Sequence, residues 1–323
     1  MAILSFSRAI NKALSDMMDL DPAVILLGED IANAGGSFGA TRGLLDRFGG
    51  HRVIDTPISE AAIAGAAVGA AMSGLRPVVE IMFMDFSTLV MDALVNQAAK
   101  ARFMFGAQCS VPMVLRTPHG GGLNAGPQHS QCLEAWFAHV PGLKVVVPSD
   151  AASAYALLRS AIADPDPVIF VENKALYAAK MEVPDDLALS LGRARLARQG
   201  KDATVVAYGA AVHWALEAAA RLAEKQIDIE VVDLLSVQPW DEEMVLTSLA
   251  KTHRLVVAHE AVEAFGVGAE IVARMADIGF DELDGPIVRV GAPFMPVPFA
   301  RSLEESFRPD ADRIVNAVLR TLE

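Results

Sequence analysis

The stretch RVIDTPISEAAIAGAAVGAAMS, residues 52–73, changes from one structural period to another. Arg52 to Asp55 form a short β-rich run, and Ser59 to Ser73 form an Ala- and Gly-rich run of helical character. Ser59 is expected to cap the helix, which places Glu60 in the first helical turn. A strand that leads directly into a helix is the repeating unit of a parallel sheet covered by helices.

The same alternation continues through the first half of the chain. Short apolar runs predict strands, and longer runs of helical period predict the helices between them. The predicted strands are Ala23–Leu27, Arg52–Asp55, Val78–Phe83, Met113–Arg116, Lys144–Val147 and Val168–Val171, and the predicted helices are Ser59–Ser73, Ser87–Phe105 and Ala151–Ala163.

A second set of alternating elements follows an interruption near residues 173–202, where the pattern dissolves. Its predicted strands are Ala203–Tyr208, Ile229–Leu234, Arg254–Ala258 and Ile287–Val290, and its predicted helices are Ala211–Gln226, Asp241–Lys251, Val267–Ile278 and Asp310–Leu322. We therefore expect an α/β protein with two doubly wound domains: residues 1–175, a linker at 176–202, and residues 203–323.

Composition excludes several classes of function. The chain has 323 residues, 53% of them hydrophobic, and a net charge of −13, which argues against a nucleic-acid partner. No apolar run is long enough to span a bilayer, and the N-terminus lacks the pattern of an export signal, so we expect a cytoplasmic protein without a membrane partner. The two cysteines, Cys109 and Cys132, form no Cys-x-x-Cys pair and are expected to be plain thiols.

Two segments could carry chemistry. Ligands of open α/β sheets lie at the carboxyl ends of strands, where Glu60 is expected, although a first-turn acid that only caps its helix is the commoner case. Residues 117–131 form a Gly-rich loop that ends near His129, whose reference pKa suits proton transfer. A loop histidine bonded to nearby backbone is again the commoner case, and the loop contains no nucleotide-binding fingerprint.

The remaining histidines and motifs give weaker signals. His139, His213 and His259 are expected to be structural, and the pair His259-Glu260 lacks a further ligand at matching spacing, so no transition-metal site is predicted. The absence of a Gly-x-Ser-x-Gly elbow argues against an α/β-hydrolase nucleophile.

Several blocks, in one order along nearly the whole chain, resemble the beta subunits of the thiamine-diphosphate-dependent decarboxylating component of 2-oxo acid dehydrogenase complexes, above all the pyruvate and acetoin types. The blocks are Gly28-Glu29-Asp30, residues 52–60, Gly74 to Glu80, Gln128-His129-Ser130-Gln131, Pro141 to Val146, Asp166 to Phe170, Glu230 to Leu234, His259-Glu260-Ala261 and Gly266 to Glu270. The resemblance implies a transketolase-like pyrimidine-binding domain followed by a transketolase C-terminal-type domain.

The resemblance also assigns roles to residues. Glu60 is implied to share a proton with the aminopyrimidine of thiamine diphosphate, so that the cofactor can deprotonate its own thiazolium carbon. His129 is implied to transfer a proton when the acyl unit passes to a lipoyl group, and Phe86 to stack against the aminopyrimidine. Glu29 and Ile58 are implied to be further neighbours of the cofactor.

One part of a thiamine enzyme is missing from this sequence. Gly28-Glu29-Asp30 is not the Gly-Asp-Gly motif that holds the diphosphate and Mg²⁺, and no other match occurs. The resemblance implies that these ligands come from an alpha subunit in an α2β2 heterotetramer, which works with a lipoyl-bearing acyltransferase. It further implies a potassium ion held largely by backbone carbonyls at Met113, Ala161, Ile162, Asp164 and Asp166.

The substrate stays open at this point. Phe86-Ser87, Gln131-Cys132 and Val171-Glu172-Asn173 favour the pyruvate and acetoin branches over the branched-chain one, but His119-Gly120-Gly121-Gly122 matches none of them closely. Two alternatives remain: half of a split transketolase, which the blocks at 128–131 and 141–146 disfavour, and a catalytically silent assembly subunit, which retention of Glu60 and His129 disfavours.

Overall fold

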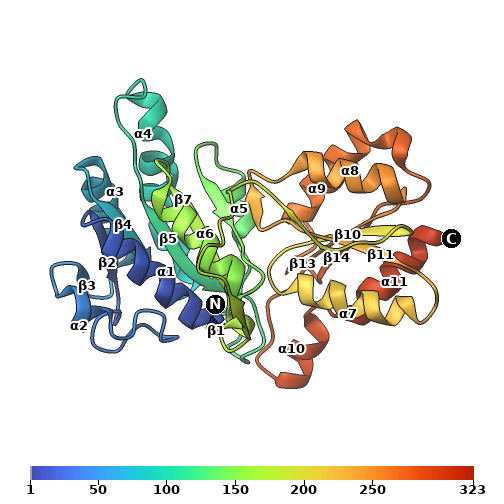
Figure 1. Cartoon of the computed structure of the whole chain (residues 1–323), viewed down its shortest axis with the longest axis horizontal. Coiled ribbons are helices and arrows are strands. Elements are labelled where there is room, and N and C mark those ends of the chain that lie inside the picture. The colour runs from blue at the N-terminus through green and yellow to red at the C-terminus, as the bar shows by residue number, and fades with distance from the viewer. Residues whose placement is uncertain (1) are drawn as a thin grey trace.

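Two mainly parallel sheets, each covered by helices on both faces, and one small two-stranded sheet make up the chain in the computed structural model, which describes residues 2–323 (Figure 1). The expected α/β class with two doubly wound sheets is confirmed. Of the helices within residues 2–323, none has the length and hydropathy that crossing a membrane requires.

The larger sheet has seven strands in the order β12-β6-β7-β5-β4-β2-β3. All neighbours are parallel except β12, which runs antiparallel to β6. The strands are β2 (Val24–Gly28), β3 (Val53–Asp55), β4 (Arg76–Glu80), β5 (Val114–His119), β6 (Lys144–Val146), β7 (Val168–Asn173) and β12 (Ser236–Gln238).

Alternate residues of these strands enter two different cores, as the two-residue period of a strand requires. One face carries Leu26 and Val78 under α1 (Phe6–Leu20) and α6 (Ala151–Ala163), which also pack on each other. The other face carries Ile25 and Val79. Its helices are α3 (Glu60–Met72), the 3₁₀ helix η1 (Met84–Val90), the π-helix η2 (Ala93–Ala98), α4 (Ala99–Met104) and α5 (Glu134–Ala138).

The smaller sheet has five strands in the order β14-β13-β10-β11-β9, parallel except for β9. Helices α7 and α11 cover one face and α8 and α9 the other (Figure 1). The elements are β9 (Arg195–Arg198), β10 (Ala203–Ala207), α7 (Ala211–Ala223), β11 (Ile229–Asp233), α8 (Glu242–Thr252), β13 (Leu255–Val262), α9 (Val267–Ile278), η4 (Phe280–Glu282), β14 (Val288–Ala292), α10 (Arg301–Phe307) and α11 (Ala311–Leu322).

The two halves of the chain are interleaved. Strand β12 comes from the second half of the sequence but completes the edge of the larger sheet beside β6. The segment 176–202, expected as a linker, contains β8 (Lys180–Val183), which pairs with β1 (Ala2–Ser5), and β9, which joins the smaller sheet. The domain boundaries given above stay predictions, but this connection contains ordered strands that the sequence pattern did not reveal.

Two further expectations need correction. Helix α1 was not predicted, although Ser5 caps it and apolar residues recur at Phe6, Ile10, Leu14 and Met18. The helix expected over 87–105 is instead three successive pieces, η1, η2 and α4, which begin at Met84. The short helices α2 (Leu44–Phe48) and η3 (Lys174–Leu176) also went unpredicted.

A buried ion cluster joins three central strands near their carboxyl ends. Arg116 of β5 is 2% exposed, and its guanidinium donates to Glu80 of β4 (2.8 Å) and through two nitrogens to Glu172 of β7 (2.7 and 3.0 Å). Tyr177 also donates to Glu172, at 2.6 Å. Burial raises the pKa of Glu172 against the opposing effect of Arg116, so each charge here depends on its partners.

We expect Arg116→Met to destabilise the chain by about 3–5 kcal/mol, because it leaves two buried carboxylates without their cation. Arg274→Met is the matched control: Arg274 makes a similar two-point pair with Glu242, at 2.6 and 3.1 Å, but is 39% exposed, so its loss should cost at most about 1 kcal/mol. Chemical denaturation of both variants measures the difference. Equal losses would show that the buried cluster contributes no more than a surface pair.

Candidate functional site

The carboxyl ends of β2 and β3 bring two acidic side chains together. Gly28 pairs with Asp55, so Glu29 and the turn that leads to Glu60 leave the sheet at the same edge. Glu60 is 8% exposed and begins α3, but Ser59 makes no side-chain capping bond, contrary to expectation. Burial and then the charge of Glu60 raise the pKa of Glu29, and one Glu29 oxygen, Oε1, has no hydrogen-bond partner among the described residues.

Such a pair can hold and move a proton. A carboxyl group whose pKa is raised by burial and by a neighbouring carboxylate favours its protonated form, so Glu29 is the member of the pair that most readily holds a proton. Within residues 2–323, the buried Oε1 is therefore an acceptor that remains available to another group. Ile58, the other residue expected here, is 83% exposed on the adjacent turn.

Three rings from two segments form a second part of the site. His129 lies edge-on to Phe83 at 4.9 Å and to Phe86 at 5.5 Å between ring centroids, and the two phenylalanines are 5.6 Å apart. Phe83 and Phe86 follow β4, whereas His129 belongs to the loop after β5. The structure thus brings together Phe86 and His129, which are 43 residues apart in the sequence.

The segment that carries His129 is held at two points, by Asp85 at Gln131 and by Lys174 at the carbonyl of His129. Asp85 Oδ1 accepts hydrogen bonds from the backbone N–H (3.2 Å) and the side-chain amide (2.8 Å) of Gln131. Lys174 Nζ donates to the carbonyl of His129 and lies 5.2 Å from the centre of the Phe83 ring. Lys174 is only 3% exposed; burial lowers its pKa, and the charge of Asp85 opposes that shift.

Residues from the second half of the chain bind the start of the same loop, at Gly121 and Asn124. Glu260, near the end of β13, accepts hydrogen bonds from the Gly121 N–H (2.8 Å), Arg308 (2.8 Å) and Asn173 (2.7 Å). Glu304 accepts one from the Asn124 N–H at 3.0 Å. Lys174, Glu304 and Arg308 were not predicted as site residues. Lys174 follows the apolar run of β7, whereas Glu304 and Arg308 lie in a polar stretch, and their partners lie up to 180 residues away.

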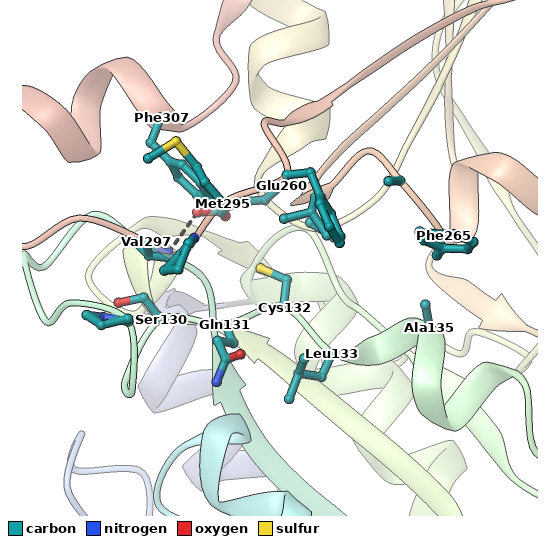
Figure 2. A pocket seen from close by; sticks show the side chains of 18 of the residues that line it. Ser130, Gln131, Cys132, Leu133, Ala135, Glu260, Phe265, Met295, Val297 and Phe307 are labelled. Carbon is teal, nitrogen blue, oxygen red and sulfur yellow. Dashed lines mark hydrogen bonds between the residues drawn. The ribbon is translucent and has the colours of Figure 1, made fainter.

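A cavity of about 760 Å³ lies between this segment and the second half of the chain (Figure 2). Ser130, Cys132, Glu260, Met295 and Val297 are among its lining residues. The hydroxyl of Ser130, a residue that is 2% exposed, has no hydrogen-bond partner among the described residues. Most of the wall is apolar, so the cavity combines a hydrophobic surface with a few convergent polar groups.

A buried polar group adjoins the cavity. His119 Nδ1 lies 3.3 Å from Glu134 Oε2, and Tyr208 donates to Glu134 Oε1 at 2.9 Å. Burial opposes ionisation of Glu134, but His119 and the hydrogen bonds from His119 and Tyr208 outweigh it and lower the pKa of Glu134. His259 stacks on Tyr208 and bonds to the carbonyl of Ala261 at 3.1 Å, which fits the structural role expected for it.

The residues named for a potassium ion lie at the opposite, amino-terminal edge of the larger sheet. Arg76 donates to the carbonyls of Ile162 (2.9 Å) and Asp164 (3.3 Å), and the carbonyl of Met113 accepts from Val168 (3.0 Å). The Asp164 carboxylate binds Lys144 at 2.7 Å. A carbonyl oxygen has two acceptor sites, so these hydrogen bonds neither require nor exclude an ion, and potassium stays a prediction.

Comparisons with known proteins identify the family to which this chain belongs. Residues 3–180 match the transketolase pyrimidine-binding domain and residues 192–314 the transketolase C-terminal domain. The chain is 46% identical over 333 residues to the beta subunit of an acetoin:2,6-dichlorophenolindophenol oxidoreductase of Bacillus subtilis (strain 168), with 99% of this chain and 97% of that protein covered. It is 44% identical over 320 residues to the pyruvate dehydrogenase E1 component subunit beta of Rhizobium meliloti (strain 1021), with 98% and 70% covered.

The chain belongs to the family of these beta subunits. The resemblance inferred from the sequence blocks is thereby confirmed, and so is the pair of transketolase-type domains. A solved structure described as a split-gene transketolase, inactive beta4 tetramer, superposes with a TM-score of 0.83 over 99% of this chain and 98% of its own. At 24% identity that likeness shows the shared fold alone.

We expect Lys174→Met to loosen the segment that carries His129 in this family member, because the His129 carbonyl loses a charged donor in a buried place. Backbone amides at 126–131 should exchange with deuterium faster, and the free energy of unfolding should fall by about 1–3 kcal/mol. Lys100→Met is the matched control, since Lys100 also donates from Nζ to a backbone carbonyl, that of Pro141 at 2.7 Å, but in an exposed place. Unchanged exchange at 126–131 in Lys174→Met would remove Lys174 from the support of His129.

Proposed function

We propose that this chain is the beta subunit of a thiamine-diphosphate-dependent dehydrogenase of the pyruvate or acetoin type, and that it supplies half of an active site. The observation that carries the proposal is the buried acid pair Glu29–Glu60 at the carboxyl edge of the sheet, together with the Phe86–His129 contact. These are the groups that the resemblance assigns to the cofactor and to acyl transfer.

The residues fit the pyrimidine half of thiamine diphosphate. When bound, the cofactor supplies the electron sink for cleavage of the bond next to the substrate carbonyl. Glu60 is buried, so a hydrogen bond from its carboxyl group to a ring nitrogen would be strong, and Glu29 beside it helps to keep a proton on the pair. Phe86 offers a ring for stacking.

His129 is suited to a different step. Its ring edge-packs against two phenylalanines and its backbone carbonyl is held by Lys174, so its orientation is fixed before any substrate arrives. We infer that it donates or accepts a proton at the acceptor that receives the acyl unit, which we propose to be the lipoyl group of an acyltransferase.

An alpha subunit is required by this proposal. The sequence has no Gly-Asp-Gly motif, so the ligands of the diphosphate and Mg²⁺ come from another chain, in the α2β2 arrangement that the resemblance implies. The surface next to Glu60 supports coverage by a partner, because Ile58 and Leu89 are 83% and 57% exposed and the outer face of α3 consists of exposed Ala and Gly. The cytoplasmic location also stays a prediction.

The substrate is a small 2-oxo acid or acetoin. Relatives with both kinds of name are similarly identical to this chain, 46% and 44%, so the comparison does not choose between them. A split transketolase is not favoured, because the likeness to that protein is confined to the fold.

Glu60→Gln tests the acid role. With the alpha subunit present, cofactor binding should persist while turnover of pyruvate or acetoin falls by about 10²- to 10⁴-fold, because the amide cannot exchange a proton. Glu270→Gln is the matched control: Glu270 is also a first-turn glutamate, in α9, but it is exposed. If both variants kept near-normal turnover and lost only about 0.3–1 kcal/mol of stability, Glu60 would be a helix-terminal charge and no more.

His129→Ala separates the two steps. It should retain part of the decarboxylation or cleavage measured with an artificial electron acceptor, but lose most of the reductive acylation of a lipoyl domain, by about 10²-fold or more. His139→Ala, which removes an exposed histidine after α5, should affect neither assay. Equal losses in both assays with normal heat stability would place His129 in the first step instead.

A further inference from the structure

His119, Cys132 and Glu134 each direct a possible metal ligand into one small volume. A ring nitrogen of His119, the Cys132 sulfur and a Glu134 carboxylate oxygen all lie within 4.8 Å of one another. His119 ends β5, Cys132 lies two residues before α5, and Glu134 begins α5. Cys132 and Glu134 are thus 13 and 15 residues after His119 in the sequence, but all three side chains converge. The sequence predicted no transition-metal site, because the adjacent pair His259-Glu260 lacks a further ligand at matching spacing.

The separation between His119 and Glu134 is a long hydrogen bond without a metal, and it also fits two side chains bound to one metal ion. The separation of 3.3 Å between Nδ1 and Oε2 is beyond the usual N–H···O range of about 2.7–3.2 Å. Two atoms bound to one tetrahedral zinc at about 2.0–2.2 Å lie about 3.3–3.6 Å apart. The other ring nitrogen, Nε2, is buried without a partner among the described residues, in a side chain that is 2% exposed.

The surroundings suit a divalent cation. Glu134 is fully buried, and Tyr208 donates to its Oε1, which orients the carboxylate and leaves Oε2 directed at His119. A neutral imidazole, a thiolate and a carboxylate together carry a charge of −2, which a divalent ion balances.

We propose that His119, Cys132 and Glu134 bind a zinc-class divalent cation. Cys132 also lines the cavity between the two halves of the chain (Figure 2), so the fourth ligand is a water molecule from that cavity. On binding, the Cys132 thiol releases its proton to solvent and a metal–sulfur bond forms; nothing is oxidised or reduced. The site is separate from the proposed catalytic groups and does not depend on the proposed function.

The test uses the fact that the chain has two cysteines. In the full-length Cys109→Ser variant, Cys132 is the single thiol, so any thiolate-to-cobalt absorption must come from it. We expect Co²⁺ added to this variant to give that near-ultraviolet absorption, with visible bands of tetrahedral strength, up to one equivalent, and Zn²⁺ to abolish both. Absence of the thiolate absorption in Cys109→Ser overturns the proposal without any variant of the site itself.

The complementary variants locate the other ligands. Cys132→Ser should lose the absorption, and His119→Gln should bind Co²⁺ at least about tenfold more weakly. Zn²⁺ should raise the thermal midpoint of the wild-type chain and of Cys109→Ser but not that of Cys132→Ser. Equal Zn²⁺ stoichiometry and equal stabilisation in Cys132→Ser and the wild type would assign the metal to another place and sink the proposal. Metal binding is measured here without turnover, so failure of the catalytic proposal leaves this result intact.

Discussion

One guanidinium group ties together the strands from which the functional segments emerge. Arg116 binds Glu80 and Glu172 across three neighbouring strands, close to the points where β4, β5 and β7 end. Phe83 follows β4, the loop of His129 follows β5, and Lys174 follows β7. The mutual positions of these three segments therefore depend on a buried ion cluster whose charges are stable only while all of them remain paired.

The second half of the chain helps to hold the Gly-rich loop that follows β5 of the larger sheet. Glu260 receives the Gly121 N–H together with Arg308 and Asn173, so the Gly-rich loop is held between elements of both halves. At Gly121 a side chain would collide with Arg308, at 2.9 Å, and Gly120 and Gly122 have φ of +86° and +96°. The glycines of this loop are therefore explained by close approach and backbone conformation, without a phosphate to cradle.

Sequence reasoning succeeded where local chemistry decides the outcome. Helices 151–163 and 267–278 were predicted with their observed bounds; Asp150 caps the first, and Gly266 and Gly279 flank the second. The separate cofactor roles of Phe86 and His129 followed from the family resemblance, whereas the contact between their rings was not predicted. Local sequence alone favoured a capping role for Glu60, whereas the structure buries it beside Glu29 and leaves Ser59 without a capping bond.

It failed where distant contacts decide the outcome. The helix expected over 87–105 breaks into 3₁₀, π and α pieces where Asp85 and Phe86 reach toward the residues of another loop. The role of Lys174 depends on a carbonyl 45 residues away, and that of Glu260 on a glycine 139 residues away. No property of the local sequence encodes such partners; even the edge strand β12 belongs to a sheet built mostly from the other half of the chain.

Residues 129–132 connect two environments that a single mutation cannot fully separate. His129 contacts the phenylalanine rings and the Gln131 side chain binds Asp85, whereas Ser130 and Cys132 line the cavity. Because these residues are consecutive, any ligand that fixes Cys132 also restricts the backbone three residues from His129. The packing of the cavity and the orientation of His129 are therefore coupled through the backbone. A mutation at Ser130 or Cys132 is expected to affect His129 as well, and the reverse also holds.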